Sequence, residues 1–244
     1  TRVRHNPSQA VERSVTLHED VETGRPADES AGCGRTIPLD AGLCCDPAAM
    51  AAALEGVRRD GAAAVSVLPP AARPPLVTAA EALPFRGARP VVGAAGREVE
   101  QDFTLCDRIG LEGLWGRVVQ AANAAVNAGL AAMTTPPIPA AHFNEVVIQH
   151  YRPVTCGISP HRDHVRYVHL VGLIILYGEG DFYICPDRSG VGAQRIPAGP
   201  GDLLLMRAPG FDASRHRPFH MLGEVRCDRL IVGLREDTRP GTTD

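Results

Sequence analysis

Two histidines and one aspartate are the side chains of this sequence best suited to carry chemistry: His161, Asp163 and His220. Two neutral imidazoles and a carboxylate can occupy one face of an octahedral iron ion and leave its other positions open, as oxidation chemistry requires. Side chains two residues apart in an extended segment point to the same face, so His161 and Asp163 can reach one ion. The pattern therefore predicts an iron site.

The third ligand of this site has an alternative. His216 lies close to His220 in the sequence, but it stands between Arg215 and Arg217 in a polar segment. His220 instead lies within an apolar, strand-like segment over residues 218–225. A remote strand is the element that a jelly roll brings across its interior, so we favour His220 as the third ligand.

Two arginines follow His220 in a further strand-like segment. Arg229, Ile231, Gly233 and Arg235 share one face of an alternating strand. An arginine that faces the interior of a barrel is costly unless it meets an anion. A carboxylate would satisfy the guanidinium with two parallel hydrogen bonds. We therefore predict an anion site at Arg229, while a solvent-facing position at a strand end stays open for both arginines.

Two helices are expected to precede the strands. A helix over residues 47–59 is predicted because Asp46 can cap its start and Gly61 can end it. A second helix is predicted over residues 111–128, with Gly129 as its stop. The Ala-rich face of this second helix would pack closely against a sheet.

Short strand-like segments dominate the second half of the chain and are separated by turn glycines. They cover residues 143–151, 167–177, 181–185, 202–207, 219–225 and 229–234, after an earlier strand at 62–68. This spacing predicts a mainly β protein with flanking helices and a double-sheet jelly-roll core from about residue 143. We expect a loosely ordered segment over 1–45, one domain over 46–244, and no clear assignment for 71–110.

The composition limits the classes of function. The 244 residues are 44% hydrophobic and carry a formal net charge of -3. This balance gives no general attraction to nucleic acid or anionic lipid. No apolar run approaches the length of about 20 residues that a membrane span needs, and the first residues are unlike a signal peptide. We therefore expect a cytoplasmic protein without a membrane partner.

The seven cysteines do not form a recognisable metal or disulfide framework. They are Cys33, Cys44, Cys45, Cys106, Cys156, Cys185 and Cys227. Their irregular spacing contains no paired Cys-x-x-Cys units, which argues against structural zinc. Reduced thiols in the cytoplasm are the expected state, and a metal or redox cluster of Cys33, Cys44 and Cys45 is the alternative.

The motif His161-x-Asp163, His220 and Arg229 resembles that of the 2-oxoglutarate- and iron(II)-dependent dioxygenase superfamily. The segment over residues 200–206 is similar to the strand that precedes the distal histidine there. The resemblance covers about residues 143–236. It implies a double-stranded β-helix, in which His161, Asp163 and His220 bind Fe(II) and Arg229 binds the distal carboxylate of 2-oxoglutarate. It also implies a reaction with O2 that releases succinate and CO2.

Two features depart from the commonest pattern of that superfamily. Many relatives have a serine two residues after the arginine, whereas this chain has Ile231. Tyr151, whose phenol could reach the interior, is the predicted replacement, and Arg235 is assigned to the same co-substrate pocket. The combination of Asn144, Tyr151, Arg229 and Arg235 is partly similar to AlkB-type dealkylases. The carboxylate of Asp163 argues against halogenation, because halogenating relatives leave that position to chloride.

Three functions compete. The first is an oxygenase that oxidises a C–H bond of a small molecule, such as an amino acid or a natural-product intermediate. The second is an AlkB-like nucleic-acid dealkylase, which requires a basic, aromatic groove. The third is a jelly-roll binding module without metal, against which the complete ligand set argues. The acidic net charge and modest size favour the first.

The substrate pocket is expected to draw on residues 71–110 and 152–169. Within the second range, four residues are candidates for binding an anionic group of the substrate: Arg152, Arg162, His164 and Arg166. His169 is expected in the core or the pocket wall, and no role is assigned to His150.

Overall fold

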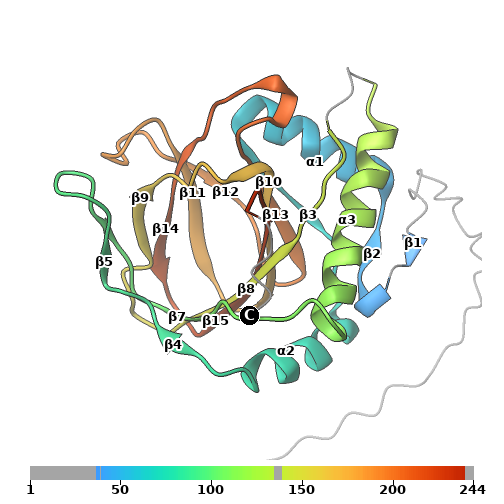
Figure 1. Cartoon of the computed structure of the whole chain (residues 1–244), viewed down its shortest axis with the longest axis horizontal. Helices are drawn as coiled ribbons and strands as arrows, with labels where there is room; N and C mark the ends of the chain where they lie inside the picture. The colour runs from blue at the N-terminus through green and yellow to red at the C-terminus, as the bar shows by residue number, and fades with distance from the viewer. Residues whose placement is uncertain (1–36, 39, 135–138, 240–244) are drawn as a thin grey trace, which may run out of the picture. The chain divides into compact units, whose positions relative to one another are not determined.

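Two antiparallel sheets form the core of the computed structural model, which describes residues 37–38, 40–134 and 139–239 (Figure 1). All described residues belong to one unit, Gly34–Asp244. Most of the predicted segment 1–45 lies outside the described residues. The predicted boundary at residue 46 therefore stays a prediction.

The larger sheet has seven strands and the smaller has four, among the residues that the structure describes. The large sheet runs in the order β3 (Ala62–Ser66), β13 (Asp202–Arg207), β10 (Tyr167–Tyr177), β15 (Arg229–Asp237), β8 (Glu145–Tyr151), β7 (Thr104–Cys106) and β4 (Arg86–Gly87). The small sheet runs in the order β12 (Gln194–Ile196), β11 (Gly180–Cys185), β14 (Phe219–Val225) and β9 (Ile158–His161). This arrangement confirms the predicted jelly-roll core with flanking helices. Strands β9 and β12 were not predicted.

Strand alternation gives the large sheet two different faces. On β15, Leu230, Val232 and Leu234 belong to the hydrophobic cluster that includes the helices. The intervening side chains of Arg229, Ile231 and Arg235 line an internal cavity between the sheets. The face predicted for these residues is the one observed.

Helices α1 (Pro47–Asp60) and α3 (Leu114–Ala132) cover the outer face of the large sheet (Figure 1). The predicted cap of α1 is confirmed, because the Asp46 side chain accepts from two backbone N–H groups of the first turn and Gly61 ends the helix at φ 91°. The prediction that Gly129 stops α3 is wrong. Gly129 lies inside the helix, where a Cβ would come within 2.3 Å of Met50 Cγ, so glycine permits close contact with α1.

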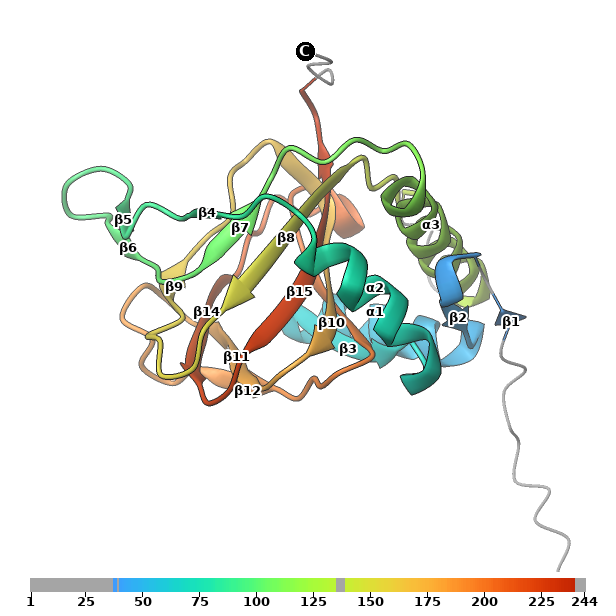
Figure 2. The same cartoon turned by 90° about the horizontal axis from the view of Figure 1, so that it is seen from below.

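Residues 71–110, which the sequence left unassigned, contain a helix and a long extended arm. The helix is α2 (Arg73–Glu81). The arm, defined here as residues 86–108, carries β4 and β7 on either side of a hairpin made by β5 (Val91–Val92) and β6 (Val99–Glu100). Figure 2 shows the hairpin extending beyond β9. The remaining elements are β1 (Ile37–Pro38), β2 (Cys44–Cys45) and the short 3-10 helices Asp40–Gly42, Pro70–Ala72 and Phe211–Ala213.

Backbone and side-chain hydrogen bonds hold the arm against the small sheet. Asp102 N donates to Gly157 O at 3.0 Å, and Glu100 N donates to Ser159 Oγ at 2.9 Å. Near the hairpin tip, Arg188 Nη1 donates to the carbonyl oxygens of Arg97 and Glu98 at 3.3 and 3.1 Å. These bonds fix the arm as one wall of the cavity.

None of the described helices is long and apolar enough to cross a membrane.

Candidate metal centre and adjoining cavity

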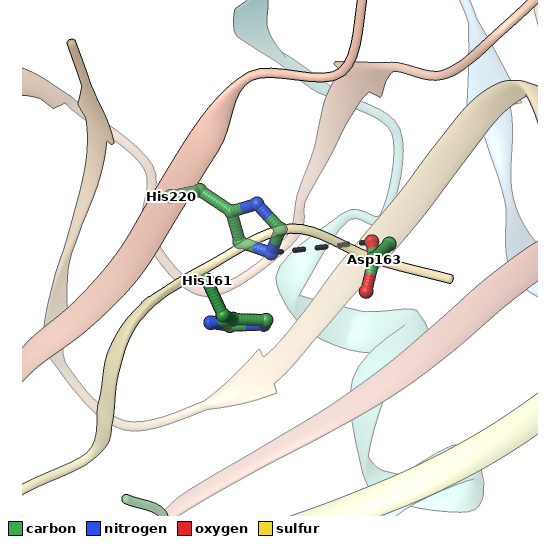
Figure 3. Close-up of side chains that lie close together, drawn as sticks. All are labelled: His161, Asp163 and His220. Carbon is green, nitrogen blue, oxygen red and sulfur yellow. Dashed lines mark ion pairs between the residues drawn. The ribbon is translucent and has the colours of Figure 1, made fainter. Parts of the chain in front are cut away.

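His161, Asp163 and His220 meet in the structure although 57 positions separate the last two in the chain numbering. His161 ends β9 and lies opposite His220 of β14 in the antiparallel register. Their ring centroids are 4.2 Å apart, and His220 Nε2 lies 3.9 Å from Asp163 Oδ2 (Figure 3). One potential ligand atom from each residue lies within 4.8 Å of the others. The three side chains can therefore hold one metal ion.

Asp163 lies two residues beyond the end of β9 at His161. His161 and Asp163 line the cavity together, whereas the guanidinium of Arg162 stacks on Phe219, which does not line it. Arg217 Nη1 donates to the backbone carbonyl of Asp163 at 2.5 Å, and Tyr167 N donates to His164 O at 3.1 Å. These bonds hold the backbone beside the carboxylate.

Each histidine of the cluster has its Nδ1 beside a backbone carbonyl two residues earlier. His161 Nδ1 lies 2.9 Å from Ser159 O, and His220 Nδ1 lies 3.4 Å from Pro218 O. In the tautomer that donates from Nδ1 to these carbonyls, Nε2 carries the free lone pair. This is the arrangement in which a histidine coordinates a metal through Nε2.

Electrostatics favour a neutral histidine and an ionised aspartate. Burial, together with the neighbouring His161, lowers the pKa of His220 to about 4. Burial alone would raise the pKa of Asp163, but the charges of His220, Arg235, His161 and Arg217 outweigh it and hold that pKa below its ordinary value. A neutral imidazole and a carboxylate at neutral pH are the forms that bind iron. The alternative ligand, His216, is exposed and is not part of the cluster.

A cavity of about 700 Å³ adjoins the cluster and is lined by both sheets and the arm. Arg229 and Tyr151 line it and are only 2% and 1% exposed, with the Arg229 guanidinium carbon 5.7 Å from the Tyr151 ring centroid. No carboxylate among the described residues pairs with Arg229, and its Nε has no hydrogen-bond partner there. Burial lowers the pKa of Arg229, which reflects the cost of an unpaired buried charge. This guanidinium is therefore suited to receive an anion.

Arg235 lies on the same wall of the cavity, and its charge acts on Asp163 and His220. Its Nε and Nη1 are buried without a hydrogen-bond partner in the described part of the chain, and its guanidinium carbon lies 5.2 Å from the Tyr167 ring centroid. Gly233 leaves room for this side chain, because a Cβ at Gly233 would lie 3.2 Å from Arg235 Nη1. Gln149, a buried polar residue that the sequence did not single out, lines the same cavity.

The structure separates the four candidate substrate residues. Arg162 and His164 line the cavity, whereas Arg152 and Arg166 do not. Arg152 is exposed in the turn after β8. Arg166 Nε lies 2.9 Å from Asp237 Oδ2, and its guanidinium stacks on the Tyr167 ring at 4.5 Å. These contacts hold the Arg166 guanidinium against Asp237 and Tyr167.

The other residues considered from the sequence lie outside the cavity lining. His150 Nε2 lies 3.3 Å from a carboxylate oxygen of Asp228. His169 has a positive φ of 56° and its Nδ1 lies 3.0 Å from Glu236 Oε2, so its prediction as a core or pocket residue is wrong. Asn144 exchanges two hydrogen bonds with the backbone of Asp237, at 2.8 and 2.9 Å, and so joins β8 to the end of β15.

The cysteines within the described residues are free thiols. Cys33 lies outside the described residues, so the alternative cluster with Cys44 and Cys45 is not tested. The one group of potential metal ligands found in the described part of the chain is His161, Asp163 and His220.

The arm supplies cavity residues that the sequence could assign only to the range 71–110, without naming individual positions. They include Arg86, Arg89, Phe103, Leu105, Asp107 and Arg108. The expectation that residues 71–110 contribute to the pocket is thus met by the arm, residues 86–108. No local motif marks these residues, because their place in the wall depends on how the arm docks on β9.

Solved structures share this fold, although no protein-family model matches the chain and no curated protein matches its sequence. An oxidoreductase of the 2OG-Fe(II) oxygenase family from Burkholderia pseudomallei is 16% identical, with a TM-score of 0.53 over 81% of this chain and 94% of the other. A prolyl-4-hydroxylase from Pseudomonas putida is 15% identical, with a TM-score of 0.53 over 77% and 98%. OsALKBH1 is 12% identical, with a TM-score of 0.52 over 72% and 98%.

These similarities establish the fold. The chain has the jelly-roll core that these 2OG-Fe(II) oxygenase structures share. At these identities the substrates of the three proteins carry no argument for this chain.

Proposed function

We propose that this protein is an Fe(II)- and 2-oxoglutarate-dependent oxygenase that oxidises a C–H bond of a small molecule. One observation carries the proposal. A complete set of two histidines and one carboxylate lines the same cavity as a buried arginine that has no carboxylate partner among the described residues. A metal needs the first feature and a dicarboxylate co-substrate needs the second. A metal-free binding module needs neither.

The residues present fit both groups. His161, Asp163 and His220 would hold Fe(II) through two Nε2 atoms and a carboxylate oxygen. Arg229 would bind the distal carboxylate of 2-oxoglutarate, and Tyr151 would donate to it in place of the serine that Ile231 replaces. Arg235, which lines the same cavity, would contribute positive charge to the same co-substrate.

When bound, iron with 2-oxoglutarate and O2 supplies an oxidative decarboxylation that yields succinate and CO2 and oxidises the substrate. The chain's own residues prepare this reaction. The backbone carbonyls of Ser159 and Pro218 orient the two imidazoles, and Arg217 holds the backbone of Asp163 through its carbonyl. The buried positions of Tyr151 and Arg229 keep bulk water from the co-substrate site.

A small-molecule substrate is favoured over nucleic acid by the formal net charge of -3. We further propose that residues 46–244 act as one oxygenase domain in the cytoplasm. Natural-product intermediates and amino acids are the substrate classes in view, and hydroxylation is the expected outcome.

The test is formation of succinate from 2-oxoglutarate by purified protein with Fe(II) and O2. Wild-type protein should form succinate even without added substrate, at a low uncoupled rate, and this rate should fall at least about tenfold in Asp163→Ala. Isothermal titration with Mn(II) supplies an independent readout, because Asp163→Ala should also weaken metal binding. His216→Ala, which removes an exposed histidine from outside the cluster, is the matched control.

Wild-type protein that binds neither Mn(II) nor 2-oxoglutarate would refute the proposal. Tight binding of single-stranded DNA that weakens steeply with salt would instead favour the nucleic-acid dealkylase.

A further inference from the structure

The cavity has the opposite charge balance to the chain as a whole. Six arginines line it: Arg86, Arg89, Arg108, Arg162, Arg229 and Arg235. The acidic residues of the same lining are Asp107 and Asp163. A strong local excess of positive charge therefore occurs in a chain whose formal net charge is -3.

The metal and the co-substrate account for only part of this excess. Asp163 belongs to the metal cluster, and Arg229 and Arg235 face the co-substrate site. Arg86 forms an ion pair with Asp107. Arg89, Arg108 and Arg162 are left over, and no carboxylate of the described residues forms an ion pair with any of them.

Two of the three remaining arginines, Arg89 and Arg108, come from the two ends of the arm and are exposed on the open side of the cavity. Arg162 is set apart from them, because its guanidinium stacks at 4.0 Å on the ring of Phe219, which does not line the cavity. On β14 the inward side chains are those of His220 and Leu222, so Phe219 and the Arg162 guanidinium lie on the other face of the small sheet.

Apolar side chains line the same cavity. Phe103 and Leu105 of the arm face it, together with Leu173 of β10 and Ile158 of β9. A ligand that satisfies both kinds of surface has an anionic group and an apolar body. Guanidinium groups bind carboxylate and phosphate oxygens alike, so the shared chemistry is an oxyanion.

We propose that the organic substrate is a small acid whose oxyanion group is bound by Arg89 and Arg108 and whose apolar body lies against Phe103 and Leu105. Its reacting carbon then faces the metal cluster. This inference rests on the proposed function for the reaction, but the anion site itself is a property of the cavity.

A nucleic acid would also offer oxyanions, but the outer part of the arm opposes it. Glu98, Glu100 and Asp102 are all exposed there, in and beside β6. These carboxylates would repel a long phosphodiester chain that lay along the arm. A small acid needs to meet only Arg89 and Arg108.

The experiment measures binding by isothermal titration to full-length protein loaded with Mn(II) and saturated with 2-oxoglutarate. The probes are hexanoate, hexyl phosphate and the neutral hexanamide. At least one acid should bind about tenfold more tightly than the amide, and the acid that does so identifies carboxylate or phosphate as the preferred group. The preference should disappear in Arg89→Gln/Arg108→Gln.

The matched control is Arg97→Gln/Arg117→Gln, which removes two positive charges at sites outside the cavity lining. It should retain the preference for the acid. Equal binding of acid and amide, absence of binding by every probe, or an equal loss in the control would overturn the proposal. So would tight binding of oligothymidylate that depends on Arg89 and Arg108.

The two proposals fail separately. A protein that prefers the acid probes but forms no succinate keeps the anion site and loses the oxygenase function. A protein that forms succinate but binds acid and amide equally keeps the function and loses the small-acid substrate.

Discussion

Gly180 of β11 lies directly against the buried side chain of Arg229. A Cβ at Gly180 would be 3.1 Å from Arg229 Cδ and 3.3 Å from Arg229 Nε. The two residues belong to different sheets. The missing side chain at Gly180 therefore leaves the space through which the guanidinium extends into the cavity.

Gly180→Ala should displace Arg229 and weaken the binding of 2-oxoglutarate. Overpacking of this size costs about 1–3 kcal/mol, and part of that cost should appear as a higher Kd in titrations with Mn(II)-loaded protein. Gly172→Ala is the control, since a Cβ at Gly172 would meet Leu203 at 3.1 Å on the helix-covered face. That variant should lose stability and keep its affinity. An unchanged Kd in Gly180→Ala would show that Arg229 does not bind the co-substrate.

Arg229→Met should separate binding from folding. Loss of the buried charge pair should weaken 2-oxoglutarate binding by about 2–4 kcal/mol. Without ligand the buried guanidinium lacks a carboxylate partner, so its replacement by an apolar side chain should raise the free energy of unfolding by about 1 kcal/mol. Thermal unfolding with and without 2-oxoglutarate measures both effects. If Arg235→Met abolishes binding and Arg229→Met does not, the carboxylate anchor is Arg235.

Tyr151→Phe tests the proposed substitute for the serine that Ile231 replaces. Burial raises the pKa of the Tyr151 phenol to about 12, so the hydroxyl stays protonated and able to donate at ordinary pH. Its loss should weaken 2-oxoglutarate binding by about 1.5–3 kcal/mol, the range for a hydrogen bond to a charged group. Because the phenol titrates only at higher pH, this difference should be constant from about pH 7 to about pH 10.

The control for this variant is Tyr177→Phe, which removes a hydroxyl that donates to Glu81 at 3.2 Å on the outer surface. It should leave the affinity for 2-oxoglutarate unchanged. If Tyr151→Phe lowers only the melting temperature, the tyrosine is a core residue and another donor serves the carboxylate.

Local patterns made much of the fold predictable. The cap at Asp46 and the left-handed Gly61 are set by neighbouring residues, so the bounds of α1 followed from the sequence. Alternation placed Arg229 and Arg235 on one face of β15, because a period of two holds wherever a strand is regular. The three candidate metal ligands could be identified from the sequence because the combination of their residue types is rare enough to indicate a shared role.

Features that depend on docking between distant segments were not predictable. The backbone carbonyl of Asp163 accepts from Arg217, which lies 54 positions later. Gly129 looked like a helix stop, but its partner is Met50 of another helix. Arg166 looked like a substrate residue, but Asp237 neutralises it from the end of β15. In each case the deciding contact joins parts of the chain that no local pattern connects.

Two asparagines of α3 form a further long-range contact of this kind. Asn127 Oδ1 accepts from Ala141 N at 2.8 Å and its Nδ2 donates to Ala141 O at 3.1 Å. One helical turn earlier, Asn123 makes the same pair of bonds to the backbone of Phe143, at 2.7 and 3.1 Å. The two side-chain amides thus supply hydrogen-bond partners to the backbone of Ala141 and Phe143, which precede β8 and lie outside its pairing with neighbouring strands.

Asn123→Ala should therefore destabilise the fold more than a surface change on the same helix. Phe143 is only 2% exposed, so its backbone N–H and carbonyl would lose their partners in a site with little access for water. Leaving such groups unsatisfied costs about 1–3 kcal/mol, measurable by urea unfolding. Gln120→Ala, an exposed position of α3, should change stability by less than about 0.5 kcal/mol. Equal effects of the two substitutions would mean that water replaces the amide, and that α3 is held against the sheet by its apolar face alone.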